Sequence, residues 1–152
     1  MKQTETRLRL CTVLIVLNLL FIWGNSLMPG PVSGAISGWL RDILAFLFPG
    51  GREDPDAGHG LLRKLAHFTE FACLGALLGW LLAMLRKKLW LALLGGCLVA
   101  SVDECIQCFV PERGPSIWDV LIDSSGVLLG VGILLMICAV KNKKSKNFLE
   151  EQ

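Results

Sequence analysis

Polar and titratable side chains stand at the ends of long apolar segments in this chain. They are Asn25, Lys64, His67, Glu70, Asp103, Glu104, Gln107, Arg113, Asp119 and Asp123. Charged groups are costly inside a membrane, so the ones that are present usually have a structural or functional reason. A carboxylic acid beside an imidazole can exchange protons near neutral pH, which is the chemistry of general acid–base catalysis. The same groups could instead bind a headgroup or an ion, or only hold helices together.

Four apolar segments position these side chains. They cover residues 8–28, 65–85, 89–110 and 117–140, and each is near the ~20 residues that cross a bilayer core. The chain is 53% hydrophobic and 18% charged, which is a low charged fraction for a soluble domain. The middle of each segment lacks the polar face of a helix in a soluble bundle. The sequence predicts an all-α, polytopic membrane protein, with one domain over residues 1–152.

The basic residues predict how the chain is oriented. Ten of the fifteen Lys and Arg residues are Lys2, Arg7, Arg9, Arg86, Lys87, Lys88, Lys141, Lys143, Lys144 and Lys146. All of them lie on one side of the membrane in a four-span topology, and basic residues are enriched on the cytoplasmic side. We therefore expect both termini in the cytoplasm, with a basic cytoplasmic tail over residues 141–152. The first segment is too long for a cleaved signal peptide and is predicted to stay as a span.

This topology brings the polar side chains to the outer half of the bundle. The second segment carries them at its start, the third at its end and the fourth at its start. In the third segment Asp103 and Gln107 share a helical face with small residues, and Asp119 and Asp123 do so in the fourth. Small residues allow helices to approach closely. We expect these faces to point into the bundle, with Lys64 and Arg113 at the rim. For Glu104 and Asp123, solvation of helix ends remains an alternative.

The segment between the first two spans has two parts. Apolar residues recur at helical spacing over residues 33–48, which predicts an amphipathic helix lying in the outer interface, with Ser33 as its N-cap. Residues 49–60 are rich in Gly, Pro and Asp and predict a loop. That loop contains His59, for which solvent exposure is expected.

Signatures of cofactors and nucleic acid are missing from the sequence. Cys105 and Cys108 form one C-x-x-C without a second pair nearby, and no H-E-x-x-H is present. No metal ligand and no cofactor are therefore predicted, although a histidine together with carboxylates can bind zinc. There is no Gly-rich phosphate loop followed by Lys, and topology explains the basic residues, so no nucleic-acid partner is predicted.

Three passages resemble the VanZ-like family of small bacterial membrane proteins. Residues 64–71, KLAHFTEF, are similar to its K-x-x-H-F-x-E-Y pattern, with Phe71 where Tyr is usual. Residues 103–113, DECIQCFVPER, are similar to D-E-x-x-Q-x-F-x-P-G-R, with Glu112 in place of Gly. Residues 119–126, DVLIDSSG, are similar to D-V-x-x-N-x-x-G, with Asp123 in place of Asn. The resemblance covers roughly residues 25–130.

The resemblance implies a place in the bacterial cell membrane and a link to the cell envelope. The founding member of the family is associated with resistance to the glycopeptide antibiotic teicoplanin, which acts outside the cell on the wall precursor. The resemblance names no reaction, so whether the protein is an enzyme stays open. Phe71 lacks the hydroxyl of the Tyr that is usual at this position in the family, so a function of that hydroxyl does not carry over to this chain.

Two functional hypotheses follow from the sequence. In the first, an outer pocket binds or acts on a membrane lipid or a lipid-linked envelope precursor. Glu70 and Asp103 would be acid, base or headgroup-binding groups, with His67 as proton partner, Asp119 as orienting group and Arg113 as anion contact. In the second, the protein works without catalysis, through a membrane-protein partner, and its polar cluster is structural. Ion transport is disfavoured, because no polar residues continue through the inner half of the spans.

Overall fold

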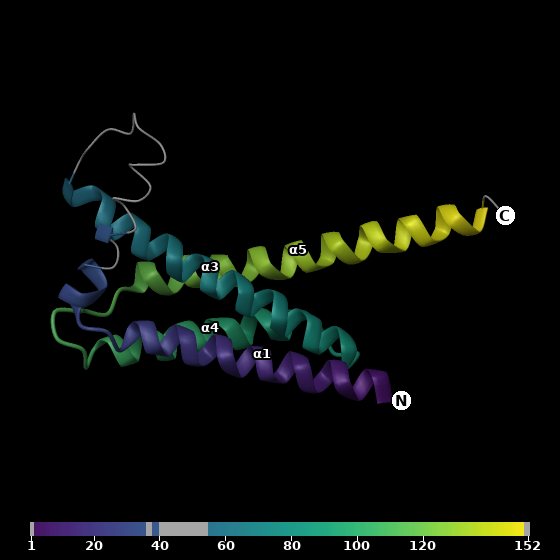
Figure 1. The fold of residues 1–152 in the computed structure, drawn as a ribbon, viewed down its shortest axis with the longest axis horizontal. Helices are drawn as coiled ribbons and strands as arrows, with labels where there is room; N and C mark the ends of the chain where they lie inside the picture. The colour runs from purple at the N-terminus through teal and green to yellow at the C-terminus, as the bar shows by residue number, and fades with distance from the viewer. Residues whose placement is uncertain (1, 36–37, 40–54, 151–152) are drawn as a thin grey trace.

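The structure, a computed structural model, describes residues 2–35, 38–39 and 55–150. Four long helices account for most of them: α1 (Lys2–Ser26), α3 (Pro55–Met84), α4 (Trp90–Gln107) and α5 (Ile117–Glu150) (Figure 1). Each contains a stretch long and apolar enough to cross a membrane, namely Lys2–Ser26, Arg63–Met84, Trp90–Gln107 and Ile117–Lys141. The predicted all-α architecture with four membrane-spanning helices is confirmed.

Two helices are longer than the sequence indicated. Helix α3 begins at Pro55, so the loop predicted over residues 49–60 is wrong for residues 55–60, which are helical; residues 49–54 lie outside the described part. Proline suits a first helical position because its missing N–H would have no partner there. Helix α5 continues through the predicted tail to Glu150. Extending an existing helix needs no new nucleus, and Lys, Leu and Glu are good helix formers.

The predicted interfacial helix falls mostly outside the described residues. Residues 30–35 and 38–39 are helical, whereas residues 36–37 and 40–48 are not described. The backbone N–H of Ser33 donates to the carbonyl oxygen of Pro29 at 3.1 Å. Ser33 therefore lies inside the first helical turn, and its prediction as the N-cap is wrong.

Helices α3 and α5 form the closest pair in the bundle. A Cβ placed on Gly130 would overlap the carbonyl oxygen of Ala72, and one on Gly126 would overlap that of Phe68. Gly75, on α3, likewise lies against the backbone of Val127. Glycine at these positions lets the two backbones touch, which is how membrane helices gain packing energy without a hydrophobic driving force.

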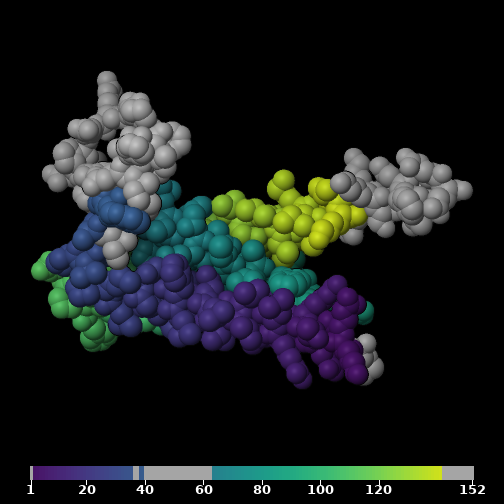
Figure 2. All heavy atoms as spheres, viewed as in Figure 1, coloured from purple at the N-terminus to yellow at the C-terminus, as the bar shows by residue number. Residues whose placement is uncertain are grey.

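The remaining helices pack around this pair. The side chain of Val127 on α5 fills the space beside Gly96 on α4, and Ile22 of α1 joins Phe71 and Leu74 of α3 in the buried core. Figure 2 shows α1 running along one face of the molecule. Large apolar residues on the outside, such as Leu20 at 61% exposure, suit a surface that faces lipid.

The two ends of the bundle differ in chemistry. One end holds the N-terminus, the α3–α4 turn and the C-terminal part of α5 (Figure 1). The other end holds the end of α1, the end of α4 and the start of α5, and we call it the polar end. Its side chains include Asn25, Asp103 and Asp119.

Candidate functional site

Glu70 is tied to α1 at the polar end. The side-chain amide of Asn25 donates to Glu70 Oε1 at 2.7 Å, and the amide of Asn18 donates to the Glu70 carbonyl oxygen at 3.5 Å. Asn18 and Asn25 are two helical turns apart, so both face α3. The second carboxylate oxygen, Oε2, is buried and has no hydrogen-bond partner among the described residues. One side of this carboxylate is thus fixed while the other is free to meet a ligand.

Asp103 lies at the centre of a second network and is fully buried. Its Oδ2 accepts hydrogen bonds from Ser26 Oγ at 2.7 Å and from Gln107 Nε2 at 3.0 Å. Gln107 sits one turn after Asp103 on α4, which brings its amide over the carboxylate. These two donors orient the carboxylate and leave Oδ1 without a hydrogen bond to the described residues.

Glu104 closes the turn between α4 and α5. Its Oε2 accepts a hydrogen bond of 2.7 Å from the backbone N–H of Ser116, directly before the start of α5. The side chain is 5% exposed, so simple solvation of a helix end does not describe it. A carboxylate at a helix N-terminus also interacts favourably with the helix dipole. The geometry gives Glu104 a structural role in placing α5.

His67 and Asp123 meet Asp103 inside the bundle. His67 Nδ1 is 3.9 Å from Asp103 Oδ2, and Asp123 is 1% exposed. One donor atom from each of the three residues lies within 4.8 Å of the others. Asp123 is therefore an interior group, and the alternative that it solvates a helix end is wrong.

Lys64 and Asp119 form an ion pair near the surface. Lys64 Nζ is 3.8 Å from Asp119 Oδ1, and their side chains are 45% and 20% exposed. They border a small cavity of about 10 Å³ that is also lined by Arg63, His67, Glu104, Gln107, Ile122 and Asp123. This places Lys64 at the rim, as the sequence indicated. It also places Asp119 farther out than Asp103 and Asp123.

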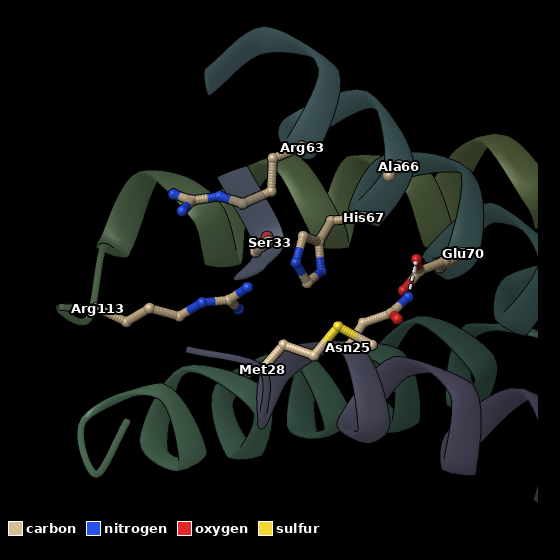
Figure 3. Close-up of a pocket in the computed structure, with 8 residues that line it drawn as sticks. All are labelled: Asn25, Met28, Ser33, Arg63, Ala66, His67, Glu70 and Arg113. Carbon is tan, nitrogen blue, oxygen red and sulfur yellow. Dashed lines mark hydrogen bonds between the residues drawn. The ribbon is translucent and has the colours of Figure 1, made fainter. Parts of the chain in front are cut away.

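A larger cavity of about 100 Å³ opens on the other side of His67. It is lined by Asn25, Met28, Ser33, Arg63, Ala66, His67, Glu70 and Arg113. Figure 3 shows Arg63 and Arg113 extending along one side of this cavity, with His67 in the middle and the hydrogen-bonded pair of Glu70 and Asn25 at the far side. Two guanidinium groups thus share a cavity with an imidazole and a carboxylate.

The protein satisfies only part of the hydrogen-bonding capacity of the Arg113 guanidinium group. Its Nη1 donates to the carbonyl oxygen of Ser26 at 3.4 Å, whereas its Nε is buried without a hydrogen-bond partner among the described residues. Burial, and next the positive charge of Arg63, lower the pKa of the Arg113 guanidinium from its ordinary value. Both conditions would be relieved by an anion between the two arginines.

The structure brings the ten predicted site residues to the polar end, and it adds two that the prediction did not include. Arg63 borders both cavities, and Ser26 donates to Asp103. Arg63 could have been found by its position one helical turn before His67. Ser26 had a weaker signal, since serine near a helix end is common for capping and solvation alone.

Among the comparisons with known proteins, only the comparison with family models finds a match. No match is found to a curated protein or to a solved structure. A family model described as VanZ/LLP1 matches residues 8–138. The match covers α1 from Leu8, the whole membrane-spanning parts of α3 and α4, and α5 up to Cys138, and it includes every residue of the two cavities. The chain therefore belongs to the VanZ/LLP1 family.

Proposed function

We propose that the larger cavity binds the anionic headgroup of a membrane lipid or a lipid-linked envelope precursor. The carrying observation is Arg113. This residue lines a cavity together with Arg63, and its buried Nε has no hydrogen-bond partner within the described residues. Phosphate accepts strong charge-assisted bonds from guanidinium groups, often two at a time. The cavity lies where the membrane spans end, which is the level of lipid headgroups.

The distribution of basic residues supports a site at the outer leaflet of a bacterial cytoplasmic membrane. The ten basic residues of the N-terminus, the α3–α4 turn and the C-terminal segment are far from the polar end along the helices. Enrichment of basic residues marks cytoplasmic segments, so both termini are assigned to the cytoplasm and the cavity to the outside. The resemblance to the VanZ-like family suggests altered susceptibility to teicoplanin as a cellular readout.

A bound headgroup would lie beside two groups that can exchange protons. His67 and Glu70 line the same cavity, and Glu70 Oε2 has no hydrogen bond to the described residues. This arrangement favours a second candidate function, acid–base chemistry on the bound headgroup. A purely structural cluster that supports a membrane-protein partner is the competing function.

Native mass spectrometry of the protein released gently from its own membranes tests the proposal. We expect a phosphate-containing lipid bound to the wild type, and its occupancy should fall about tenfold or more in Arg113→Gln and in Arg63→Gln/Arg113→Gln. The reason is that a hydrogen bond to a charged group is worth about 1.5–3 kcal/mol. Arg9→Gln, at an exposed position near the other end of α1, is the matched control and should keep the lipid.

Equal lipid occupancy in the wild type and the double variant would reject the headgroup site. Glu70→Gln separates binding from chemistry, because an acid or base that is lost leaves the lipid bound while the cellular phenotype disappears. Retention of the phenotype in Glu70→Gln and Asp103→Asn would instead favour the non-catalytic, partner-based function.

A further inference from the structure

His67, Asp103 and Asp123 form a compact group of donor atoms beside the cavity that holds the two arginines. They come from three different helices, α3, α4 and α5, and one donor atom of each lies within 4.8 Å of the others. Asp103 is 0% exposed and Asp123 is 1% exposed. This is a largely buried site made of an imidazole and two carboxylates.

Each member of the group keeps a donor atom unused. His67 Nδ1, Asp103 Oδ1 and Asp123 Oδ1 are all buried, and none has a hydrogen-bond partner in the described part of the chain. Buried polar atoms are nearly always paired, so an unpartnered atom on each of three residues whose ligand atoms come this close points to a group that is held between the residues. The two hydrogen bonds to Asp103 Oδ2 come from Ser26 and Gln107 and fix the carboxylate from behind.

The two carboxylates of this group, Asp103 and Asp123, lack a direct ion pair with Lys or Arg among the described side chains. The titratable nitrogen at ion-pair distance is His67 Nδ1, which is 3.9 Å from Asp103 Oδ2 and carries a charge only when it is protonated. Lys64 is engaged with Asp119 at 3.8 Å. Two buried carboxylates in a membrane-spanning bundle need a counter-charge, a coordinated cation or a bound proton, and a cation can neutralise both at once.

We propose that His67, Asp103 and Asp123 bind a divalent transition-metal cation, with Zn²⁺ as the first candidate. An imidazole with two carboxylates is a common ligand set for zinc, and imidazole disfavours Mg²⁺ and Ca²⁺, which select oxygen ligands. Ser26 and Gln107 act as outer-shell partners that orient Asp103, as such ligands require. The sequence predicted no metal, because these ligands lie far apart along the chain and form no local motif.

The space beside the group fits one ion. Ligand atoms lie ~2.0–2.2 Å from zinc, so donors around a tetrahedral ion are roughly 3.3–3.5 Å apart, and small side-chain rotations would draw the three donors to that spacing. His67 and Asp123 border the cavity of about 10 Å³, which is near the minimum volume that holds a single water molecule. The same cavity reaches Lys64 and Asp119 at the surface, which gives a cation a route of entry. Three protein ligands leave a fourth position for water.

Zinc titration of the full chain in mild detergent tests this site. The protein carries a tag without histidine and the substitutions Cys105→Ser and Cys108→Ser, because both thiols are exposed and could bind zinc themselves. We expect one tight Zn²⁺ per chain by elemental analysis after dialysis. Affinity should fall at least ~10–100-fold in Asp123→Asn and His67→Gln, the range known for the loss of outer-shell partners alone. Glu112→Gln, an exposed carboxylate in the α4–α5 turn, should bind zinc as before.

A second readout guards against misfolded variants. Zn²⁺ should raise the midpoint of thermal unfolding of the starting protein, because a ligand that binds only the folded state stabilises it. This rise should disappear in Asp123→Asn. The same variant should still unfold in one cooperative transition without metal, which shows that it is folded. The proposal is overturned if Zn²⁺ does not bind the starting protein, if Asp123→Asn and His67→Gln both keep its affinity, or if Glu112→Gln loses as much as they do.

The metal site stands independently of the headgroup proposal, since zinc binding is measured without added lipid. Arg63→Gln/Arg113→Gln separates the two. We expect this variant to lose the lipid and to keep the zinc, because neither arginine is a ligand. If the double variant loses the lipid and none of the proteins binds zinc, the metal site is rejected and the headgroup site is kept. If the starting protein binds zinc and the double variant keeps the lipid, the headgroup site is rejected and the metal site is kept.

Discussion

At the scale of single residues, the site is built from side chains that use only part of their hydrogen-bonding capacity within the protein. Glu70, Asp103 and Arg113 each make at least one hydrogen bond to the protein and each keep one buried polar atom without a partner in the described residues. A group that only held helices together would gain most by using all of its hydrogen-bonding capacity. The pattern therefore favours side chains that are oriented by the protein and reserved for a ligand.

The bond between Asn25 and Glu70 can be measured directly by a double-mutant cycle. We expect Asn25→Ala and Glu70→Ala to couple by about 0.6–1.7 kcal/mol in the free energy of unfolding, the average and upper values for side-chain hydrogen bonds between membrane helices. Reversible unfolding of the reconstituted protein gives these energies. Asn18 supplies the control, because its amide reaches the Glu70 carbonyl oxygen and not the carboxylate. A cycle of Asn18→Ala with Glu70→Ala should be close to additive.

Additivity in the Asn25 cycle would show that the 2.7 Å contact contributes nothing to stability. Strong coupling in the Asn18 cycle would show that Glu70→Ala disturbs the backbone of α3. In that case the Asn25 value could not be assigned to the side-chain bond.

At the scale of elements, the contact between α3 and α5 sets the distances within the site. Gly126 and Gly130 lie directly below Asp123 on α5 and touch the backbone of α3 at Phe68 and Ala72. His67 is the residue before Phe68, so the same contact brings the imidazole to Asp123. A larger residue at either glycine would push apart the two helices that carry these groups.

Gly130→Ala tests this contact with a single methyl group. The new Cβ would overlap the carbonyl oxygen of Ala72, and backbone cannot move aside as a side chain does, so we expect a loss of about 1–3 kcal/mol. Gly132→Ala, in the same helix, has nothing within 4 Å of its new Cβ. It should be neutral or stabilise by up to ~1 kcal/mol through helix propensity. Thermal unfolding in the same detergent compares the two variants; equal midpoints would mean that α3 and α5 are not in backbone contact.

At the scale of the whole molecule, chemistry and charge are separated along the bundle. The polar cavities lie at one end, and Lys2, Arg86 and Lys141 mark basic segments toward the other end. Basic residues hold their segments in the cytoplasm during insertion. The distribution of charge therefore predicts which face of the membrane the candidate site meets.

Cysteine labelling in cells tests this orientation. In a variant without native cysteines, Gly114→Cys places a thiol in the α4–α5 turn, where a Cβ meets nothing within 4 Å. Lys87→Cys places one in the α3–α4 turn. A membrane-impermeant maleimide should label Gly114→Cys in intact cells and Lys87→Cys only after the membrane is opened. The inverse pattern would place the cavities in the cytoplasm and reject an outer-leaflet ligand.

The sequence by itself determined the membrane class, the number of spans and the end of the bundle at which the polar residues gather. Apolar length and hydropathy are local properties, and alternating spans must return polar residues at a shared end. It also placed Asp103 with Gln107 and Asp123 with Gly126 on common helical faces, because a helix has a fixed period. Local sequence signals did not predict that α3 begins at Pro55 or that α5 continues to Glu150. The continuation of a helix depends on cooperativity more than on residue type.

Only the tertiary structure decided which atoms meet. The convergence of His67, Asp103 and Asp123 depends on the rotation and height of three helices relative to one another, which the α3–α5 backbone contact fixes. The approach of Arg63 to Arg113 depends in the same way on the turn after α4. Helical period specifies a face but not the partner of that face, because packing between helices is set by the shapes of both surfaces together.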